Sequence, residues 1–338
     1  MKISVAMATY NGEKYIIEQL ESIRKQTFHV DEVIINDDCS TDGTVKLIED
    51  YLSMHHLINW KMFINKANRG FSENFYEAVK KTNGDIIFLA DQDDIWLSNK
   101  VEITQHVFNN NKTLKVLSSG QTFIDSNGEN IDNSVKEITN ENKKMNLRYL
   151  PFDFFIGSSV IPGCTMCIHK EIREFLFNFG APDLSKSFGH DWYYCMVGAA
   201  IGQFALIDNV LIKRRIHENN ASKASSRKTT ILSTTTNRRN DYLVEIILAH
   251  QFFLNNKYFV SQLANRDIER VKKILRFFKK RFEFSISKNL FSWIGLGFSF
   301  FNYYHCSKSF KGAVQLYIAD LFYTYNINWK TQNKTIAK

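Results

Sequence analysis

Short apolar segments alternate with amphipathic helical segments through residues 1–112, and this alternation restricts the fold more than any other feature. The apolar segments, typical of buried strands, are 3–8, 33–36, 62–64 and 85–90. Between the first two, Ile16, Leu20 and Ile23 recur at helical spacing. Strands alternating with helices form right-handed βαβ units. The sequence therefore predicts an α/β fold, with a mostly parallel sheet and helices on both faces.

The pattern changes after residue 112. Strands are predicted at 116–124, 163–168 and 204–216, and a helix at 189–201. A polar stretch follows at 218–240, and residues 241–338 read as basic, aromatic-rich amphipathic helices. We expect one domain at 1–217, made of parts 1–112 and 113–217, then a linker at 218–240 and a helical region at 241–338.

Three carboxylates lie in the four residues Asp91-Gln92-Asp93-Asp94, directly after the predicted strand at 85–90. Ligands of open α/β sheets gather at the carboxyl ends of strands. Carboxylate oxygens are the ligands that Mg²⁺ and Mn²⁺ prefer. The cluster indicates a divalent metal holding a phosphorylated ligand; a solvated acidic turn is the alternative interpretation.

Two other predicted strands also end in polar residues: Thr9-Tyr10-Asn11 and Asp37-Asp38. Because a parallel sheet brings such ends to one edge, all three clusters can share a ligand. The dinucleotide and P-loop glycine motifs are both missing from the sequence. Ionised aspartates suit ribose hydroxyls or a base N–H, and the Arg69 guanidinium suits a phosphate or a base carbonyl. Together they predict a nucleoside diphosphate with its metal.

Charge is distributed unevenly along the chain. Residues 1–209 hold 20 Lys+Arg against 28 Asp+Glu, and residues 210–338 hold 23 against 7, which gives −8 and +16. The aromatic content of the basic part favours an anionic membrane surface over nucleic acid. Its most apolar run, 290–304, is shorter than the roughly 20 residues that span a bilayer. An interfacial helix and a packing or oligomer interface remain the two interpretations.

The five cysteines form no regular framework, and Met1-Lys2 leads directly into a strand-like segment. These features predict a cytoplasmic protein with free thiols. Cys164-x-x-Cys167 raises redox or zinc chemistry as an alternative. A single pair within a strand-like run is better interpreted as packing.

Several strings, in this order, resemble the family 2 glycosyltransferases of the GT-A fold, which are inverting and use nucleotide sugars. The strings are Ala8-Thr9-Tyr10-Asn11-Gly12, Gln26-Thr27, Asp37-Asp38-Cys39-Ser40-Thr41-Asp42-Gly43-Thr44, Asn68-Arg69-Gly70, Gly84-Asp85 and Asp91-Gln92-Asp93-Asp94. The resemblance covers about 1–217. His190-Asp191-Trp192 and Pro162-Gly163-Cys164-Thr165-Met166 look like a subgroup that includes rhamnosyltransferases.

The resemblance implies a role for each matching position. Nucleotide-binding residues are Thr9, Tyr10, Asn11, Glu13, Asp37, Asp38, Arg69, Asp91 and Gln92. Asp91, Asp93 and His217 match the shell of a Mn²⁺ or Mg²⁺ ion, although a histidine at 217 can instead approach the donor diphosphate. A purely structural role for His217 is the alternative interpretation. Residues assigned to the acceptor or the sugar are Asp94, Trp96, Gly163, Cys164, His190 and Trp192.

Asp191 matches the general base, where many members have Glu-Asp in place of His190-Asp191. Inverting transfer needs a base that takes the acceptor hydroxyl proton. A carboxylate at a helix start is rigidly held. The alternative is that Asp191 only caps its helix.

The predicted function is transfer of a sugar from a nucleoside diphosphate to a saccharide or lipid-linked acceptor in cell-surface polysaccharide synthesis. The favoured donor is dTDP-rhamnose, with a UDP-hexose as the alternative. The predicted location is cytoplasmic, peripheral at the inner face of the plasma membrane. Two rival classes are a metal-dependent phosphoryl-transfer enzyme and a non-enzymatic nucleotide- or nucleic-acid-binding module.

Overall fold

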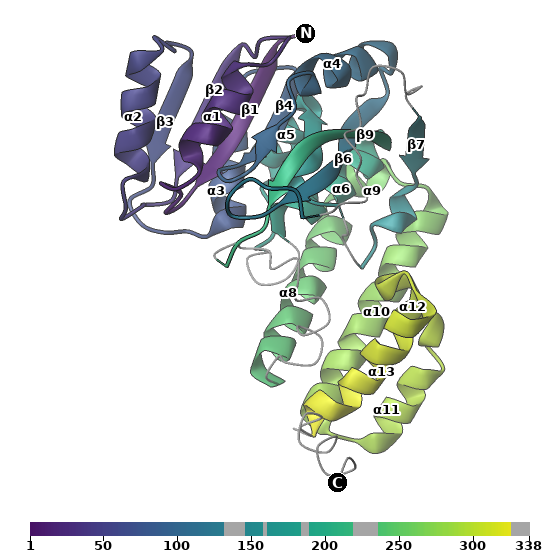
Figure 1. Ribbon diagram of the computed structural model, residues 1–338. Coiled ribbons are helices and arrows are strands. Elements are labelled where there is room, and N and C mark those ends of the chain that lie inside the picture. Colours follow the sequence, from purple (N-terminus) through teal and green to yellow (C-terminus); the bar gives the residue numbers. More distant parts are fainter. Residues whose placement is uncertain (132–145, 158–160, 184–188, 219–235, 326–338) are drawn as a thin grey trace. The chain divides into compact units, whose positions relative to one another are not determined.

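The computed structural model describes residues 1–131, 146–157, 161–183, 189–218 and 236–325. The chain separates into two compact units (Figure 1). The first comprises Met1–Pro151, Ser159–Ala181 and Gly189–Ala221, and the second Phe152–Ser158, Pro182–Phe188 and Ser222–Lys338. Most of the linker predicted at 218–240 lies outside the described residues.

The first unit contains one mixed sheet with the strand order β3-β2-β1-β4-β8-β6-β9-β5. Its parallel half consists of β1 (Ile3–Thr9), β2 (Glu32–Asp37), β3 (Trp60–Ile64) and β4 (Ile86–Asp91). The other half contains β5 (Ile95–Trp96), β6 (Leu114–Ile124), β8 (Met166–His169) and β9 (Gln203–Arg215), with β7 (Leu147–Leu150) beside β9. Here only β6 and β9 run parallel. The predicted α/β fold class is confirmed, with antiparallel pairs that the sequence did not indicate.

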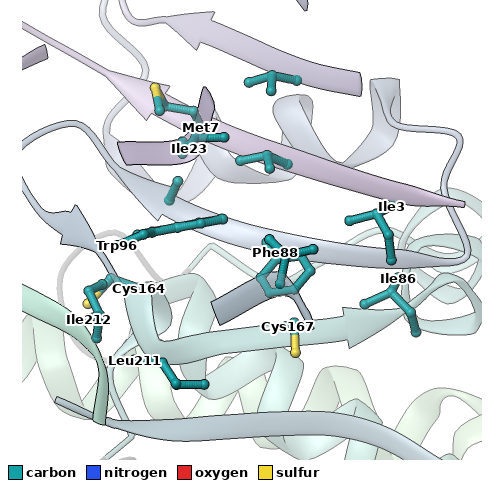
Figure 2. Close-up of a cluster of buried hydrophobic side chains, with 14 of the residues drawn as sticks. Ile3, Met7, Ile23, Ile86, Phe88, Trp96, Cys164, Cys167, Leu211 and Ile212 are labelled. Atoms are coloured by element: carbon teal, nitrogen blue, oxygen red, sulfur yellow. The ribbon is translucent and has the colours of Figure 1, made fainter. Parts of the chain in front are cut away.

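Six helices are described in the first unit: α1 (Ile16–Arg24), α2 (Thr44–Met54), α3 (Phe71–Lys81), α4 (Lys100–Asn110), α5 (Lys170–Phe179) and α6 (Gly189–Ile201). Alternate strand residues such as Met7 and Phe88 pack with Ile23 of α1 in one buried cluster (Figure 2). Helix α3 packs on β1 and β2 and also contacts α6. This packing fixes the positions of the carboxyl ends of the strands.

The register of the parallel strands brings the three polar clusters together. Thr9 pairs with Asp37 across β1 and β2, and Ala8 pairs with Asp91 across β1 and β4. The ends of all three strands therefore meet at one edge of the sheet, as the sequence predicts.

The second unit is helical. It contains α8 (Thr236–Asn255), α9 (Lys257–Ser261), α10 (Asn265–Ser287), α11 (Leu290–Gly297), α12 (Phe300–Ser307) and α13 (Phe310–Thr324). Arg281 donates to both oxygens of buried Asp320, at 2.9 and 3.0 Å, and Arg239 and Tyr303 contact the same carboxylate. Among the described residues, no helix has the length and apolarity needed to cross a membrane.

Candidate active site

Asp37, at the end of β2, is fully buried, and its carboxylate accepts hydrogen bonds from the end of β1 and from the turn after β2. Thr9 Oγ1 donates to its Oδ2 at 2.7 Å, and the Ser40 hydroxyl donates to the same oxygen at 2.6 Å. The Ser40 backbone N–H donates to Oδ1 at 2.8 Å. Asp37 therefore fixes the turn after β2 and joins it to β1.

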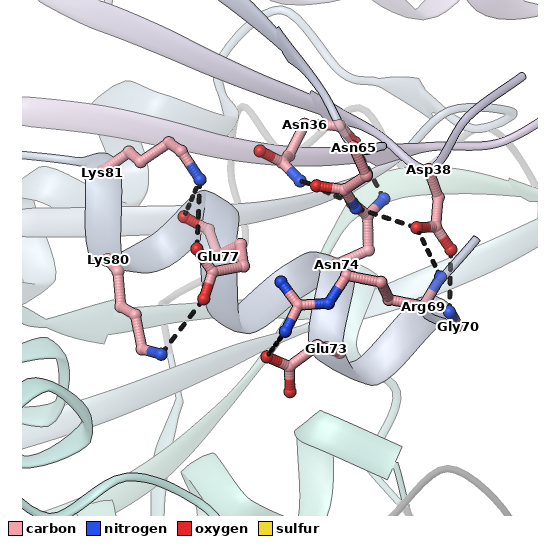
Figure 3. Close-up of polar contacts among 10 residues, drawn as sticks. All are labelled: Asn36, Asp38, Asn65, Arg69, Gly70, Glu73, Asn74, Glu77, Lys80 and Lys81. Carbon is pink, nitrogen blue, oxygen red and sulfur yellow. Dashed lines mark hydrogen bonds and ion pairs between the residues drawn. The ribbon is translucent and has the colours of Figure 1, made fainter. Parts of the chain in front are cut away.

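Asp38 organises the loop that leads into α3 (Figure 3). Its carboxylate accepts the backbone N–H groups of Arg69 and Gly70 and the side-chain amide of Asn65, each at 2.8 Å. The guanidinium of Arg69, about half exposed, pairs with Glu73 at 2.8 Å. Asp38 and Arg69 therefore contact each other through the Arg69 backbone, while the Arg69 guanidinium pairs with Glu73.

Buried amides lie beneath this loop. Asn36 Nδ2 donates to Asn74 Oδ1 at 2.7 Å, and Asn74 Nδ2 donates to the Asn36 carbonyl at 2.8 Å. Sequence reasoning missed this network. An amide within the otherwise apolar strand segment 33–36 was the available signal, because a buried amide needs partners.

The loop after β1 is held by residues from two other strand ends. Gln92 accepts the Tyr10 N–H at 2.7 Å and donates to the Tyr10 carbonyl at 2.9 Å. Asn11, in the left-handed region with φ of 48°, accepts the Thr41 N–H at 2.8 Å. Glu13 accepts the Gly43 N–H at 2.7 Å. Tyr10 is 45% exposed and presents its ring to solvent.

The end of β4 brings several carboxylates close together in a buried place. Burial and repulsion from Asp93 raise the pKa of Asp91 to about 6. Burial, followed by the charges of Asp93 and Asp91, raises the pKa of Asp94 well above its usual value. Asp94 Oδ1 accepts the Arg215 N–H at 2.9 Å, but Asp94 Oδ2 has no partner among the described residues.

Asp91, Asp94 and Cys164 each offer a ligand atom, and these atoms lie within 4.8 Å of one another. Asp93 lies 2.8 Å from His217 Nε2 through its Oδ2. Of the predicted metal residues, Asp93 and His217 therefore contact each other, whereas Asp91 is grouped with Asp94 and Cys164.

Lys100, at the start of α4, is a buried cation that sequence reasoning missed. Its Nζ donates to the Cys164 carbonyl at 3.0 Å and lies 4.3 Å from the ring centroid of Trp96. Burial lowers its pKa to about 8, although Asp94 and Asp91 act in the opposite direction. The positive charge of the Lys100 ammonium partly offsets the negative charge of Asp91 and Asp94.

Asp191 lies in the first turn of α6. Burial raises its pKa to about 7; the Trp192 N–H, 2.9 Å from Oδ1, opposes the shift, and the charge of Asp91 adds to it. A pKa near neutrality is the value expected of a general base. The electrostatic interaction with Asp91 connects this carboxylate with the end of β4.

His190 packs as a neutral ring beside Asp191. It stacks on Phe75 with centroids 3.9 Å apart, and burial lowers its pKa to about 3. Neither ring nitrogen has a hydrogen-bond partner among the described residues. A Cβ on Gly163 would come 2.7 Å from His190 Nε2, so only glycine lets this turn lie against α6.

Three residues predicted for the sugar or acceptor lie in the core instead. Trp192 has no exposed surface, Trp96 is 3% exposed and Cys164 is 1% exposed. Trp96 packs on Phe88 because β5 pairs with β9 (Figure 2). Cys164 lies in a 3-10 turn before β8, where a strand was predicted. All five cysteines are described, and none forms a disulfide.

Comparison with known proteins identifies similar chains. The family model "Glycosyl transferase family 2" matches residues 4–175. The dTDP-rhamnosyl transferase RfbG of Shigella flexneri is 31% identical over 289 residues, covering 81% of this chain and 94% of that protein. The poly(ribitol-phosphate) beta-N-acetylglucosaminyltransferase TarS of Staphylococcus aureus is 40% identical over 96 residues, 28% of this chain and 16% of that protein.

A solved structure shares the fold. The structure of S. aureus TarS 1-349 in complex with UDP-GlcNAc aligns with a TM-score of 0.60 at 18% identity, covering 96% of this chain and 92% of that chain.

Proposed function

The chain belongs to glycosyl transferase family 2, and from this membership we propose that it transfers a sugar, with inversion, from a nucleoside diphosphate to an acceptor hydroxyl. The acceptor is a saccharide or a lipid-linked saccharide in cell-surface polysaccharide synthesis. The favoured donor is dTDP-rhamnose, supported by the similarity to a dTDP-rhamnosyl transferase. A UDP-hexose is the alternative, since the structural neighbour was solved with UDP-GlcNAc. The proposed location is the cytoplasmic face of the plasma membrane.

One observation carries the proposal: two acidic sites with different surroundings lie in the same unit. The carboxylates at the end of β4 repel one another, and Asp94 Oδ2 has no partner among the described residues. Asp191 stands separately on α6 with a pKa of about 7. The first site suits a cation and a diphosphate, and the second suits proton transfer.

The residues at the end of β4 fit Mn²⁺ or Mg²⁺. Oxygen donors suit both ions, and the imidazole of His217 shifts the preference towards Mn²⁺. Asp91, Asp93 and His217 would hold the ion. When bound, it would supply positive charge to the departing diphosphate.

The chain's own residues supply the remaining steps. Asp191 would accept the proton of the attacking hydroxyl, and its buried position raises its pKa toward the operating pH. Asp37, Asp38 and Gln92 would shape the nucleotide pocket by holding the three loops at the sheet edge. The exposed ring of Tyr10 is placed to stack on a base or sugar.

Thermal-shift measurements with Mn²⁺ and dTDP, UDP or GDP test the proposal. We expect a nucleoside diphosphate to raise Tm only together with the metal, and dTDP-rhamnose to be hydrolysed faster than UDP-hexoses. Asp93→Asn should reduce the joint shift and require a higher Mn²⁺ concentration for it. The matched control is Asp50→Asn, because Asp50 is exposed and pairs only with Lys46 in α2. Equal stabilisation without metal would contradict the metal site, and no hydrolysis of any nucleotide sugar would contradict the transferase.

A further inference from the structure

The second unit exposes large apolar side chains along α11 and the start of α12. Phe291, Ile294, Phe298 and Phe301 are 82%, 48%, 92% and 63% exposed. Their spacings of three, four and three residues place side chains along one side of a helix. Helical spacing relates Phe291, Ile294 and Phe298, since Phe298 keeps αR dihedrals at the end of α11. Ser299, with φ of −102° and ψ of 18°, then breaks the helix before Phe301 of α12. We call these four side chains the apolar stripe.

The apolar stripe is not needed for the core of the second unit. The same segment buries Leu296 and Tyr303, and Trp293 stacks on Tyr317 of α13 with centroids 4.6 Å apart. A helix between a core and water normally turns polar residues outward. In α11 and the start of α12, both the side that faces the core and the side that faces solvent are apolar. An outer apolar side of this kind indicates an interaction surface.

A basic surface accompanies the stripe. Exposed residues of α10 include Lys272, Lys273, Arg276, Lys279 and Lys280, which we call the basic face. The opposite side of α10 buries Ile274, Phe277 and Phe278. Arg270, which precedes the basic face on α10, places its guanidinium 5.2 Å from the ring centroid of Phe301, so a cation of the same helix lies beside the stripe.

We propose that this surface docks on an anionic lipid bilayer: the apolar stripe inserts at the level of the acyl-chain boundary, and the basic face lies over the headgroups. Apolar side chains beside Lys and Arg are the combination that binds anionic membranes. Phosphate backbones of nucleic acids would use the basic face but leave the stripe exposed. A second copy of the chain would bring two basic faces together, which charge repulsion opposes.

Sedimentation of the full chain with lipid vesicles tests the stripe. The vesicles are phosphatidylcholine alone and phosphatidylcholine with about one third phosphatidylglycerol. We expect binding to the anionic vesicles, weakened about tenfold by the double variant Phe298→Ser, Phe301→Ser, because two inserted aromatic side chains are removed. The matched control is Met54→Ser, Ile58→Ser, since these first-unit side chains are 72% and 86% exposed.

A charge-reversed variant tests the basic face. Lys272→Glu, Arg276→Glu, Lys279→Glu should remove the preference for anionic vesicles and the sensitivity of binding to salt. The control reverses three exposed lysines of the first unit, Lys61, Lys66 and Lys112. It should leave binding within about twofold of the wild type, since these lysines do not belong to the basic face.

Donor hydrolysis in solution separates this inference from the proposed function, and all variants should retain it. Wild-type protein that hydrolyses donor but fails to bind anionic vesicles, or binds neutral ones equally well, would overturn the membrane surface alone. A mass that falls from dimer to monomer in the stripe variant, without vesicle binding, would show instead that the stripe joins two copies. Vesicle binding without donor hydrolysis would leave the membrane surface intact and remove the proposed function.

Discussion

Two strands of the same sheet end in clusters of aspartates, but the fold uses the two ends differently. At the end of β2, Asp37 and Asp38 accept hydrogen bonds from the loops around them on both oxygens of each carboxylate. At the end of β4, burial and the neighbouring carboxylates raise the pKa of Asp91 to about 6 and that of Asp94 well above its ordinary value.

The contrast distinguishes aspartates that stabilise the loops of the site from aspartates that we propose to bind a ligand. A carboxylate satisfied by backbone N–H groups stabilises its loop and gains little from a cation. Carboxylates that repel one another in a buried place gain much from one. The aspartates at the end of β2 therefore shape the pocket, and we propose that those at the end of β4 bind the metal.

The largest expected effect is that of replacing Asp191, the acidic residue on α6. Asp191→Asn keeps the shape of the side chain but cannot accept the acceptor proton. We expect turnover to fall by roughly 10²–10⁴-fold while donor binding is retained. Turnover with acceptor and the donor-induced Tm shift, measured together, check this. Turnover close to that of the wild type would reduce Asp191 to a helix cap.

Much of this arrangement follows from local sequence. The apolar strand segments and the parallel connection place Thr9, Asp37 and Asp91 at one edge, and the register confirms it. The hydrogen-bond partners of the site residues do not follow from local sequence, because these partners are distant along the chain. Asp94 Oδ1 accepts a hydrogen bond from Arg215, which is 121 residues away.

The two tryptophans show the same limit. Trp96 belongs to a two-residue strand that only its pairing with Ile212 of β9 defines, and that pairing buries the indole. Trp192 lies on α6, which is buried on nearly every side, so helical periodicity gives no sign of which face meets a ligand.

Removing one carboxylate at the end of β4 should weaken the metal site without weakening the fold. We expect Asp93→Asn to lower turnover roughly 10²-fold at limiting Mn²⁺, with partial recovery in excess Mn²⁺, because His217 and Asp91 remain. The Tm of the metal-free protein should stay close to that of the wild type. Loss of turnover that no metal concentration relieves would argue against a metal role for Asp93.

The pH dependence of kcat/KM should report Asp191. The active form is ionised, and burial raises the pKa to about 7. Activity should therefore be present above pH 7 and fall about tenfold for each pH unit below it. A pH titration at saturating metal measures this. A profile that stays flat down to pH 5 would contradict Asp191 as the base.

At the β2 end, the effect should be on stability. Asp38→Asn cannot accept from both the Arg69 and the Gly70 N–H, because an amide offers one oxygen. We expect the free energy of unfolding to fall by about 1–3 kcal/mol, measured by denaturant titration. Asp50→Asn again serves as the exposed control. An unchanged midpoint would mean that water satisfies this loop and that the contrast between the two strand ends is smaller than the contacts indicate.

The smallest effect tests the β4 end in the absence of metal. Because the folded pKa of Asp91 is about 6, above the ordinary value of 3.8, the folded protein binds more protons than the unfolded chain between those values. Stability of the metal-free protein should therefore fall as pH rises from about 4 to about 6. Asp94 also has a raised pKa, so Asp94→Asn removes its contribution to this pH dependence but keeps an oxygen for the Arg215 N–H; the variant should flatten the slope and raise Tm slightly. Unfolding midpoints of the two proteins at pH 4.5 and 6.5, with chelator present, compare the slopes. A steeper slope in the variant would show that Asp94 stabilises the fold as the aspartates at the end of β2 do.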